Sequence, residues 1–282
     1  MAIINHIKTV LLLGILTAIL LFLGSLFGPT GLTVAIVFVA AMNLITYFFS
    51  HKLVLLIYRA KEAKKSDYPK LHKTIEELAK KANIPKPKIY TIPTNNLNAF
   101  ASGNSPRNAV VACTDGILKA LNHNELEGVL AHEISHVKNR DILITTIAAT
   151  IGGIISYLAM MARFGAIFGG MGNNRDSGNI FALLALSILA PIAALVVQLA
   201  ISRTREYQAD ASGAKLIKDG EPLASALIKL HEHNKHNPIR FGSPATSSLF
   251  IINPFSSSFL VNILSTHPDY KKRVERLKGM KF

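Results

Sequence analysis

Long apolar stretches constrain this chain more than any other feature of its sequence. Three of them reach the roughly 20 residues that a helix needs to cross the hydrocarbon of a bilayer, at Ile7 to Phe27, Leu32 to Phe49 and Ile180 to Ile201. A fourth, Ile142 to Phe168, is long enough but contains Arg163. Any one could be the core helix of a soluble protein, but a 282-residue chain that is 50% hydrophobic has too little polar surface to cover four. We therefore predict a mainly α membrane protein with four transmembrane helices.

The first apolar stretch has a second interpretation as part of a removable signal peptide, because Lys8 precedes most of it. It is longer than the apolar region of a signal peptide, however, and another apolar stretch follows closely. An uncleaved membrane anchor is therefore expected.

The distribution of charge predicts the orientation in the membrane. The net charge of +14 is concentrated in two polar segments, His51 to Asp141 and Ser202 to Phe282. The short connections Gly28 to Gly31 and Gly169 to Asn179 are almost uncharged. Because basic residues favour the cytoplasmic side, both polar segments and both termini are expected to face the cytoplasm in a multi-pass protein of the cell membrane. This topology accounts for the basic excess, so no nucleic-acid binding is expected.

The chain accordingly divides into four parts. Residues 1–50 and residues 142–201 would each contain two transmembrane helices. Residues 51–141 and residues 202–282 would combine into one cytoplasmic α+β domain.

Local patterns predict several elements in the first polar part. Ser66 stands ahead of an amphipathic helical pattern that ends near Asn83. The short β-branched runs Lys88 to Ile92 and Ala109 to Cys113 predict strands of a small sheet.

A helix predicted to begin at Asn122 carries the strongest functional motif. Asn122, with Glu125 three residues later, resembles a capping box. His132 and His136 then lie four residues apart on one helix face, so both imidazoles can reach one metal ion, with Glu133 beside them. A pair of exposed histidines on a soluble helix is the alternative.

A catalytic zinc ion takes three protein ligands and keeps one position for water, so a third ligand is needed. The single cysteine, Cys113, is a poor candidate because it lies in a predicted strand. Glu206 is a better one, because the two predicted spans between His136 and Glu206 return the chain to the same side of the membrane. Asp210, one turn after Glu206, would hold the other ring N–H of a ligand histidine. Two solvated acids on a cytoplasmic helix are the alternative to one Zn²⁺ per chain.

These residues are suited to the hydrolysis of peptide bonds. Zinc acidifies bound water and polarises a carbonyl group. Glu133 would take the proton from that water and pass it to the leaving nitrogen. If the helix of His136 continues into the predicted span at Ile142, the site lies within about a nanometre of the bilayer. We expect a cytoplasmic zincin-like α+β catalytic domain that contains a small β-sheet.

Five features together point to a known family. They are the four apolar stretches, the run His132 to Asp141, the spacing of Glu206 and Asp210, the run Asn98 to Ala101, and the run Ser265 to Pro268. Over nearly its whole length the chain resembles the HtpX-type membrane metalloproteases, which are related to the CAAX prenyl proteases. The resemblance implies zinc bound by His132, His136 and Glu206, Glu133 as the catalytic base, and a role in stress response and quality control of membrane proteins.

The resemblance also implies roles for residues that no local pattern identifies. Asn98, Ala99 and Phe100 would belong to an edge strand that aligns the main chain of the substrate, with an ordinary loop as the alternative. His267 would stabilise the oxyanion of the tetrahedral intermediate. Members of the family often have a second Pro after this His-Pro pair, whereas Asp269 stands there in this chain. A surface histidine beside a helix is the alternative for His267.

Two other functions share parts of this pattern. A CAAX-type enzyme that processes prenylated peptides would have the same site but would need a large enclosed chamber, for which four spans are few. A non-catalytic membrane scaffold tied together by zinc would need a closed coordination sphere, and no fourth protein ligand is evident. The resemblance implies that membrane-protein or unfolded polypeptides are the substrates. The oligomeric state has no signature in the sequence.

Overall fold

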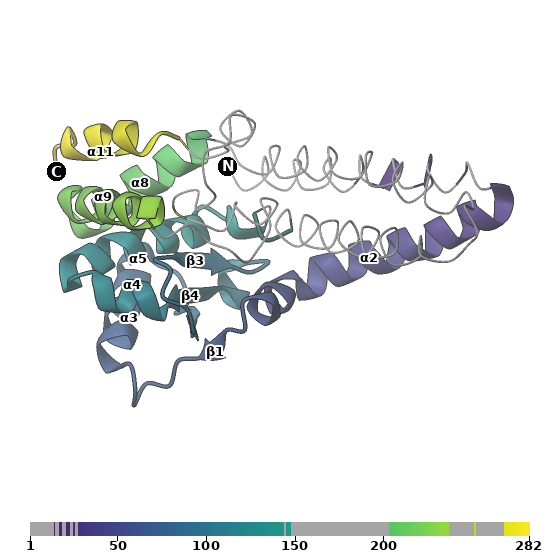
Figure 1. The fold of residues 1–282 in the computed structure, drawn as a ribbon, viewed down its shortest axis with the longest axis horizontal. Coiled ribbons are helices and arrows are strands. Elements are labelled where there is room, and N and C mark those ends of the chain that lie inside the picture. The colour runs from purple at the N-terminus through teal and green to yellow at the C-terminus, as the bar shows by residue number, and fades with distance from the viewer. Residues whose placement is uncertain are drawn as a thin grey trace.

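The computed structural model describes residues 28–143, 145–147, 203–236 and 268–282, together with Ile251 and a few separate positions before residue 28. In this part of the chain, helices surround one small four-stranded mixed sheet (Figure 1). The predicted combination of a mainly helical fold with a small sheet is confirmed. Three of the four predicted spans, at residues 7–27, 142–168 and 180–201, lie wholly or largely outside the described residues.

Helix α2, Gly28–Ile57, contains the remaining predicted span, Leu32 to Phe49. Among the described residues it is the one helix long and apolar enough to cross a membrane, with a mean hydropathy of 1.8 over Gly28–Ile45. The helix begins earlier than predicted, because Gly28 to Gly31 form its first turn and not a connection. Gly28 supports this start with a φ of 74°, and Pro29 is tolerated in a first turn, where its missing N–H has no partner to lose.

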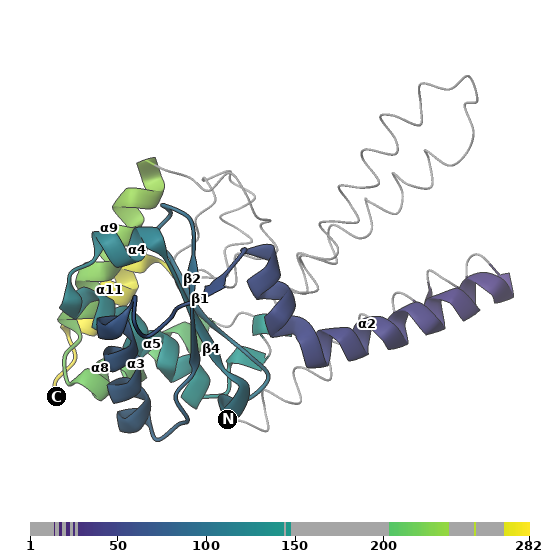
Figure 2. The same cartoon turned by 90° about the horizontal axis from the view of Figure 1, so that it is seen from below.

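The C-terminal end of α2 docks on the sheet. The helix continues through residue 50, where the sequence suggested a division, and buries Val54 and Leu55 against one sheet face, together with Tyr58 just after its end. The rings of Tyr58 and Phe100 lie 5.7 Å apart there. Among the described elements, the rest of α2 projects away from the domain (Figures 1 and 2).

The sheet has the strand order β1-β2-β4-β3, with β3 at one edge. Its strands are β1 (Lys61–Glu62), β2 (Lys88–Ile92), β3 (Ala99–Ser102) and β4 (Val110–Thr114). The two central strands, β2 and β4, are parallel, and each edge strand pairs antiparallel with its neighbour. β2 coincides with the predicted strand, and β4 lies one residue later than predicted.

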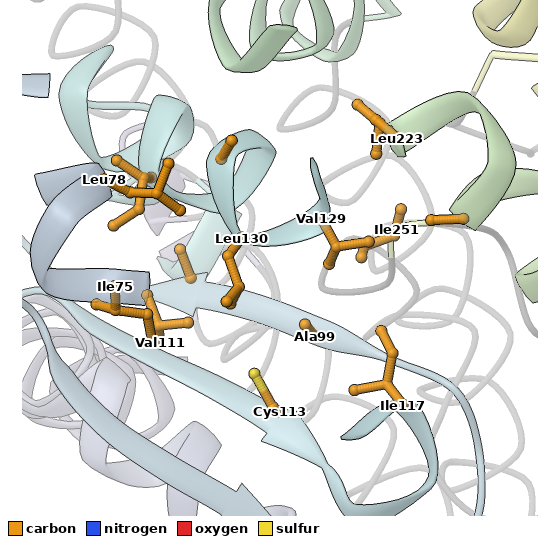
Figure 3. Close-up of a cluster of buried hydrophobic side chains, with 14 of the residues drawn as sticks. Ile75, Leu78, Ala99, Val111, Cys113, Ile117, Val129, Leu130, Leu223 and Ile251 are labelled. Carbon is orange, nitrogen blue, oxygen red and sulfur yellow. The ribbon is translucent and has the colours of Figure 1, made fainter. Parts of the chain in front are cut away.

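Three helices complete this half of the domain, α3 (Pro69–Ala82), α4 (Asp115–Ala120) and α5 (His123–Lys138). Helices α3 and α5 cover the face of the sheet opposite α2, and their apolar side chains form the main core (Figure 3). α3 begins at Pro69 and not after Ser66, because the Ser66 hydroxyl donates to Asp67 and caps no helix. It ends as predicted at Asn83, which takes a left-handed conformation with φ 56°.

The C-terminal part of the chain packs on the other side of α5. It supplies α8 (Arg203–Ile217), α9 (Glu221–His236) and α11 (Tyr270–Lys278). Two glycines allow close approach of the helix backbones: Gly128 of α5 lies against Leu223, and Gly213 of α8 lies against His132. Helix α5 therefore lies between the sheet and the C-terminal helices.

Helix α5 ends at Lys138 and does not run on into the predicted span at Ile142, contrary to expectation. The break occurs because Arg140 adopts a left-handed conformation with φ 59°. Helical structure resumes at Ile142.

Candidate metal centre

The start of α5 is fixed by the predicted capping box. Asn122 Oδ1 accepts from the Glu125 N–H at 2.9 Å, and the Glu125 carboxylate accepts from the Asn122 N–H at 2.9 Å. Glu125 also accepts from Ser225 and Lys229 of α9. These contacts fix the position of α5 along α9, and therefore also the position of the two histidines of α5 relative to the C-terminal helices.

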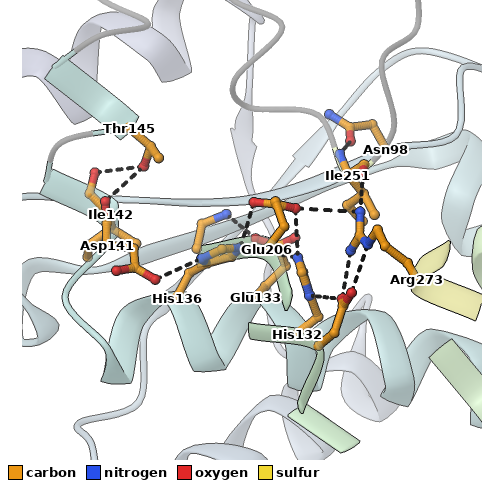
Figure 4. Close-up of polar contacts among 12 residues, drawn as sticks. Asn98, His132, Glu133, His136, Asp141, Ile142, Thr145, Glu206, Ile251 and Arg273 are labelled. Atoms are coloured by element: carbon orange, nitrogen blue, oxygen red, sulfur yellow. Dashed lines mark hydrogen bonds and ion pairs between the residues drawn. The ribbon is translucent and has the colours of Figure 1, made fainter. Parts of the chain in front are cut away.

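Three potential ligands converge between α5 and α8 (Figure 4). The Nε2 atoms of His132 and His136 are 3.1 Å apart. Glu206 places one carboxylate oxygen 3.8 Å from His132 Nε2 and the other 3.6 Å from His136 Nε2. All three side chains are largely buried, with His136 the most exposed at 13%. The structure thus brings together the three residues that the sequence suggested.

The spacing of these atoms fits a tetrahedral metal ion. Zinc–nitrogen and zinc–oxygen bonds of about 2.0–2.2 Å in tetrahedral geometry place neighbouring ligand atoms about 3.3 Å apart. The two Nε2 atoms, 3.1 Å apart, are close to that value, and each has a different Glu206 oxygen nearby, at 3.8 Å from His132 and 3.6 Å from His136. Small side-chain movements would be enough to close the Glu206 gaps.

Each imidazole is also held from behind by a carboxylate. Asp210 Oδ1 lies 2.9 Å from His132 Nδ1, and Asp141 Oδ2 lies 3.2 Å from His136 Nδ1. An ionised carboxylate only accepts hydrogen bonds, so each Nδ1 that faces one would carry its proton, which leaves the two Nε2 atoms, 3.1 Å apart, as the nitrogens that can bind a metal ion. Two unprotonated nitrogens that face each other at this distance repel unless a proton or a metal ion lies between them, so this donor set suits a metal ion.

Arg273 of α11 is a member of the site that the sequence did not identify. Its guanidinium donates to both oxygens of Asp210, at 2.8 and 2.7 Å, and lies 3.5 Å from Glu206. It also donates to the Ile251 carbonyl at 2.7 Å. Burial raises the pKa of Asp210, but Arg273 and His132 outweigh burial and bring it below its ordinary value. The sequence gives no local signal for this role, since Arg273 is one of several basic residues in α11.

The buried charges of the site sum to a negative value that a divalent cation would balance. Among the described residues, the buried groups at the site include four acids and two arginines. The acids are Glu133, Asp141, Glu206 and Asp210, and the arginines are Arg205 and Arg273. When all six are ionised, four negative and two positive charges sum to −2, which one Zn²⁺ would neutralise.

Protonation of His136 offsets one of these two negative charges when no metal is bound. Burial lowers the pKa of His136, but the hydrogen bond to Asp141 and the charges of Glu206 and Glu133 outweigh it and raise the pKa to about 9. The negative carboxylates therefore attract positive charge to this position, whether as protons or as a metal ion.

Glu133 lies on the same helix between the two histidines, as predicted. Its carboxylate accepts from the Ala101 N–H of β3 at 2.7 Å and is 4% exposed. Burial raises the pKa of Glu133, with His132 and His136 acting in the opposite direction. A buried carboxylate with a raised pKa is suited to taking up and returning a proton.

The predicted substrate-binding residues lie at the edge of the sheet. Ala99 and Phe100 belong to β3, an edge strand as the resemblance implied, and Phe100 turns its ring toward α2 and away from the metal ligands. In the register with β4, the main-chain N–H and C=O of Phe100 face Ala112, whereas those of Ala99 and Ala101 face the open edge. Asn98 Oδ1 accepts from the Ile251 N–H at 3.3 Å in this structure. His267 lies outside the described residues, so its predicted role stays a prediction.

Comparison with known protein families gives a consistent result. The model of peptidase family M48 matches residues 65–281. Three curated relatives each carry the description "Protease HtpX homolog". The protein from Persephonella marina is 50% identical over 281 residues, which is 98% of this chain and 97% of the relative. That from Pyrococcus furiosus is 48% identical over 96% of this chain and 94% of its own length. That from Syntrophobacter fumaroxidans is 45% identical over 98% and 99%.

A solved structure is similar in fold. The crystal structure of Ste24p from S. mikatae has a TM-score of 0.51 and 22% sequence identity, and the match covers 98% of this chain. The chain spans 66% of that protein. At this level of identity the similarity establishes the fold alone.

Proposed function

Since the chain belongs to peptidase family M48, we propose that it is a zinc-dependent endopeptidase that cuts membrane-protein or unfolded polypeptides at the cytoplasmic face of the cell membrane. It is a membrane metalloprotease, as its family and its relatives indicate. The finer parts of the proposal are the metal, the residues that act on the substrate, the substrate class and the topology.

The observation that carries the proposal is the arrangement of facing Nε2 atoms beside Glu206. His132, His136 and Glu206 would hold one zinc ion per chain, with Asp210 behind His132. When bound, the ion would supply a Lewis acid and lower the pKa of a coordinated water. No fourth protein ligand lies in the described cluster, which favours a catalytic over a purely structural site.

Glu133 would act as the general base and then as the general acid. Its carboxylate is already anchored through one contact, to the Ala101 N–H, which limits the directions in which it can accept a proton. The proton taken from water would go to the nitrogen of the leaving amine, so that the carboxylate is regenerated at the end of the cycle. Burial keeps the base away from bulk water between these two transfers.

Substrate would bind in extended form along β3. Among the described strands β3 lies at the edge of the sheet and pairs with β4 on one side. On its other side the Ala101 N–H already donates to Glu133, so the outward main-chain groups of the neighbouring Ala99 could pair with a peptide beside Glu133. Pairing of this kind depends little on side-chain identity, which suits a protease for unfolded polypeptides. We assign Asn98, Ala99 and Phe100 to this binding edge and His267 to the oxyanion of the intermediate.

The proposed topology has four transmembrane helices, with α2 as the second. Both polar parts of the chain and both termini would face the cytoplasm, in agreement with the basic excess in these parts. The metal centre would then lie close to the bilayer, where damaged membrane proteins expose cleavable segments.

The test is to replace Glu133 with glutamine in the full-length protein purified in detergent and loaded with zinc. The amide keeps the size of the side chain and can still accept from Ala101, so zinc content should remain while cleavage of an unfolded reporter protein is lost. Glu127→Gln, on the same helix and away from the ligands, is the matched control and should cut normally. Full activity of a zinc-loaded Glu133→Gln protein would refute the assigned role.

Two further arms separate the alternatives. Cleavage by wild type that persists after verified removal of zinc would exclude a metalloprotease mechanism for this site. Cleavage of a prenylated C-terminal peptide, with the unfolded reporter left intact, would favour a CAAX-type enzyme. Tight zinc binding without any cleavage would favour a scaffold.

A further inference from the structure

The turn after α5 has the geometry of a Schellman motif. The Arg140 N–H donates to the Val137 carbonyl at 3.1 Å, and the Asp141 N–H donates to the His136 carbonyl at 3.0 Å. Arg140 supplies the left-handed residue that this motif requires, with φ 59°. The chain therefore reverses its direction within three residues of the end of the helix.

This reversal returns Asp141 to the last turn of α5. Its carboxylate lies 3.2 Å from His136 Nδ1, and the residue is only 2% exposed. Its carbonyl accepts from the Thr145 backbone N–H at 3.3 Å and from the Thr145 hydroxyl at 3.2 Å, where helical structure resumes. Asp141 is thus held on both sides by backbone geometry, and its carboxylate cannot easily turn away from the imidazole.

The two histidines are consequently oriented by different means. Asp210 reaches His132 from another helix, so that contact exists only when α8 is docked on α5. Asp141 reaches His136 across five residues of the same turn, so this contact is local to the end of α5, and Arg205 of α8 lies close enough to interact with the same carboxylate.

We propose that Asp141 is a positioning residue that fixes the orientation and tautomer of the His136 imidazole for metal binding. The proposal rests on the metal centre described above. A carboxylate behind a ligand imidazole orients the ring and increases its basicity, and removal of such a partner lowers metal affinity by about 10- to 100-fold. The Schellman turn is the device that presents this carboxylate.

The test measures metal affinity and does not depend on peptidase activity. Zinc affinity of the full-length protein in detergent is measured by competition with a chromophoric chelator, and the cobalt-substituted protein gives a ligand-field spectrum. Asp141→Asn should bind zinc about 10- to 100-fold more weakly and show an altered cobalt spectrum. Asp67→Asn, an exposed acid in the loop before α3, is the control and should bind as wild type does.

A second pair of variants leaves the carboxylate untouched and changes only the turn. Arg140→Gly favours the left-handed conformation, whereas Arg140→Val disfavours it because a β-branched residue is strained at positive φ. Zinc should bind more weakly to the valine variant than to the glycine variant. If Asp141→Asn does not fold, the comparison of the two Arg140 variants still tests whether Asp141 positions His136 for metal binding.

The possible outcomes separate the two proposals. Wild-type affinity and an unchanged cobalt spectrum in Asp141→Asn, or equal zinc affinity in the two Arg140 variants, would overturn the positioning role while leaving the metal centre intact. Failure of the wild-type protein to bind zinc or cobalt at all would overturn the metal centre itself.

Discussion

Replacing Gly213 with alanine is expected to weaken metal binding without unfolding the domain. Gly213 follows Glu206 by seven residues and Asp210 by three, so all three residues face α5 from one side of α8. A Cβ at residue 213 would lie 2.9 Å from the His132 backbone nitrogen, whereas ordinary contacts begin at 3.4 Å. The two helices must therefore separate by about 0.5 Å at this point.

Such a separation adds to the distance that the Glu206 side chain must already move to reach the metal ion. Ligand distances must hold to within about 0.2 Å, so a shift of this size in Glu206 and Asp210 should lower zinc affinity by about 10- to 100-fold. Overpacking itself costs about 1–3 kcal/mol, and the higher helix propensity of alanine offsets up to about 1 kcal/mol of that. The variant should therefore remain folded.

The assay combines zinc affinity, measured by chelator competition, with thermal unfolding of the metal-free protein. Gly128→Ala is a matched control, because its Cβ would lie 2.6 Å from the Leu223 nitrogen and would separate α5 from α9, which carries none of the proposed ligands. That variant should lose thermal stability without a comparable loss of zinc affinity. Zinc affinity of Gly213→Ala equal to that of wild type would refute the reasoning.

Two further variants test the charges around α5. Arg273→Met leaves the Asp210 carboxylate buried without its guanidinium partner, which should cost about 3–5 kcal/mol of unfolding free energy in a denaturant titration. Arg276→Met on the surface of the same helix should cost far less, and equal losses would contradict this account. Burial raises the pKa of Glu125, but the hydrogen bonds from Lys229 and the other donors outweigh burial and bring the pKa below 4.5. The ionised Glu125 carboxylate therefore stabilises the fold above pH 4.5, and this stabilisation is lost as the pH falls below 4.5. Glu125→Gln should therefore be less stable than wild type at neutral pH, and this difference should shrink below pH 4.5; a gap independent of pH would contradict the assignment.

Elements with a local cause could be predicted from the sequence. The capping box of α5 depends on two residues three apart, and the exchange of hydrogen bonds between Asn122 and Glu125 is found as expected. β2 is a β-branched run bounded by prolines and was placed correctly. β3 has no such pattern, because all four of its residues are buried and none alternates with a polar neighbour. It becomes a strand through its pairing with β4, and only the family resemblance indicated it.

The candidate site shows the same division between local and tertiary causes. The helical spacing of His132 and His136, and of Glu206 and Asp210, is a local property, so the pattern could suggest these four residues. Arg273 could not be chosen in this way, because α11 has five basic residues in nine and only the tertiary fold buries one of them. The end of α5 was also missed, since Arg140 is an unusual residue for a left-handed position that glycine commonly fills.

The continuity of α2 limits how its length can change in evolution. The helix joins an apolar segment to a docking face formed by Val54, Leu55 and Tyr58, with no break between them. Each inserted residue would rotate that face by about 100° and lift it by about 1.5 Å. One extra residue would thus turn the docking side chains off the sheet, whereas seven would return them to nearly the same phase about 10 Å further out. Insertions or deletions in the corresponding helix of homologous proteins should therefore be of about seven residues, which is close to two helical turns.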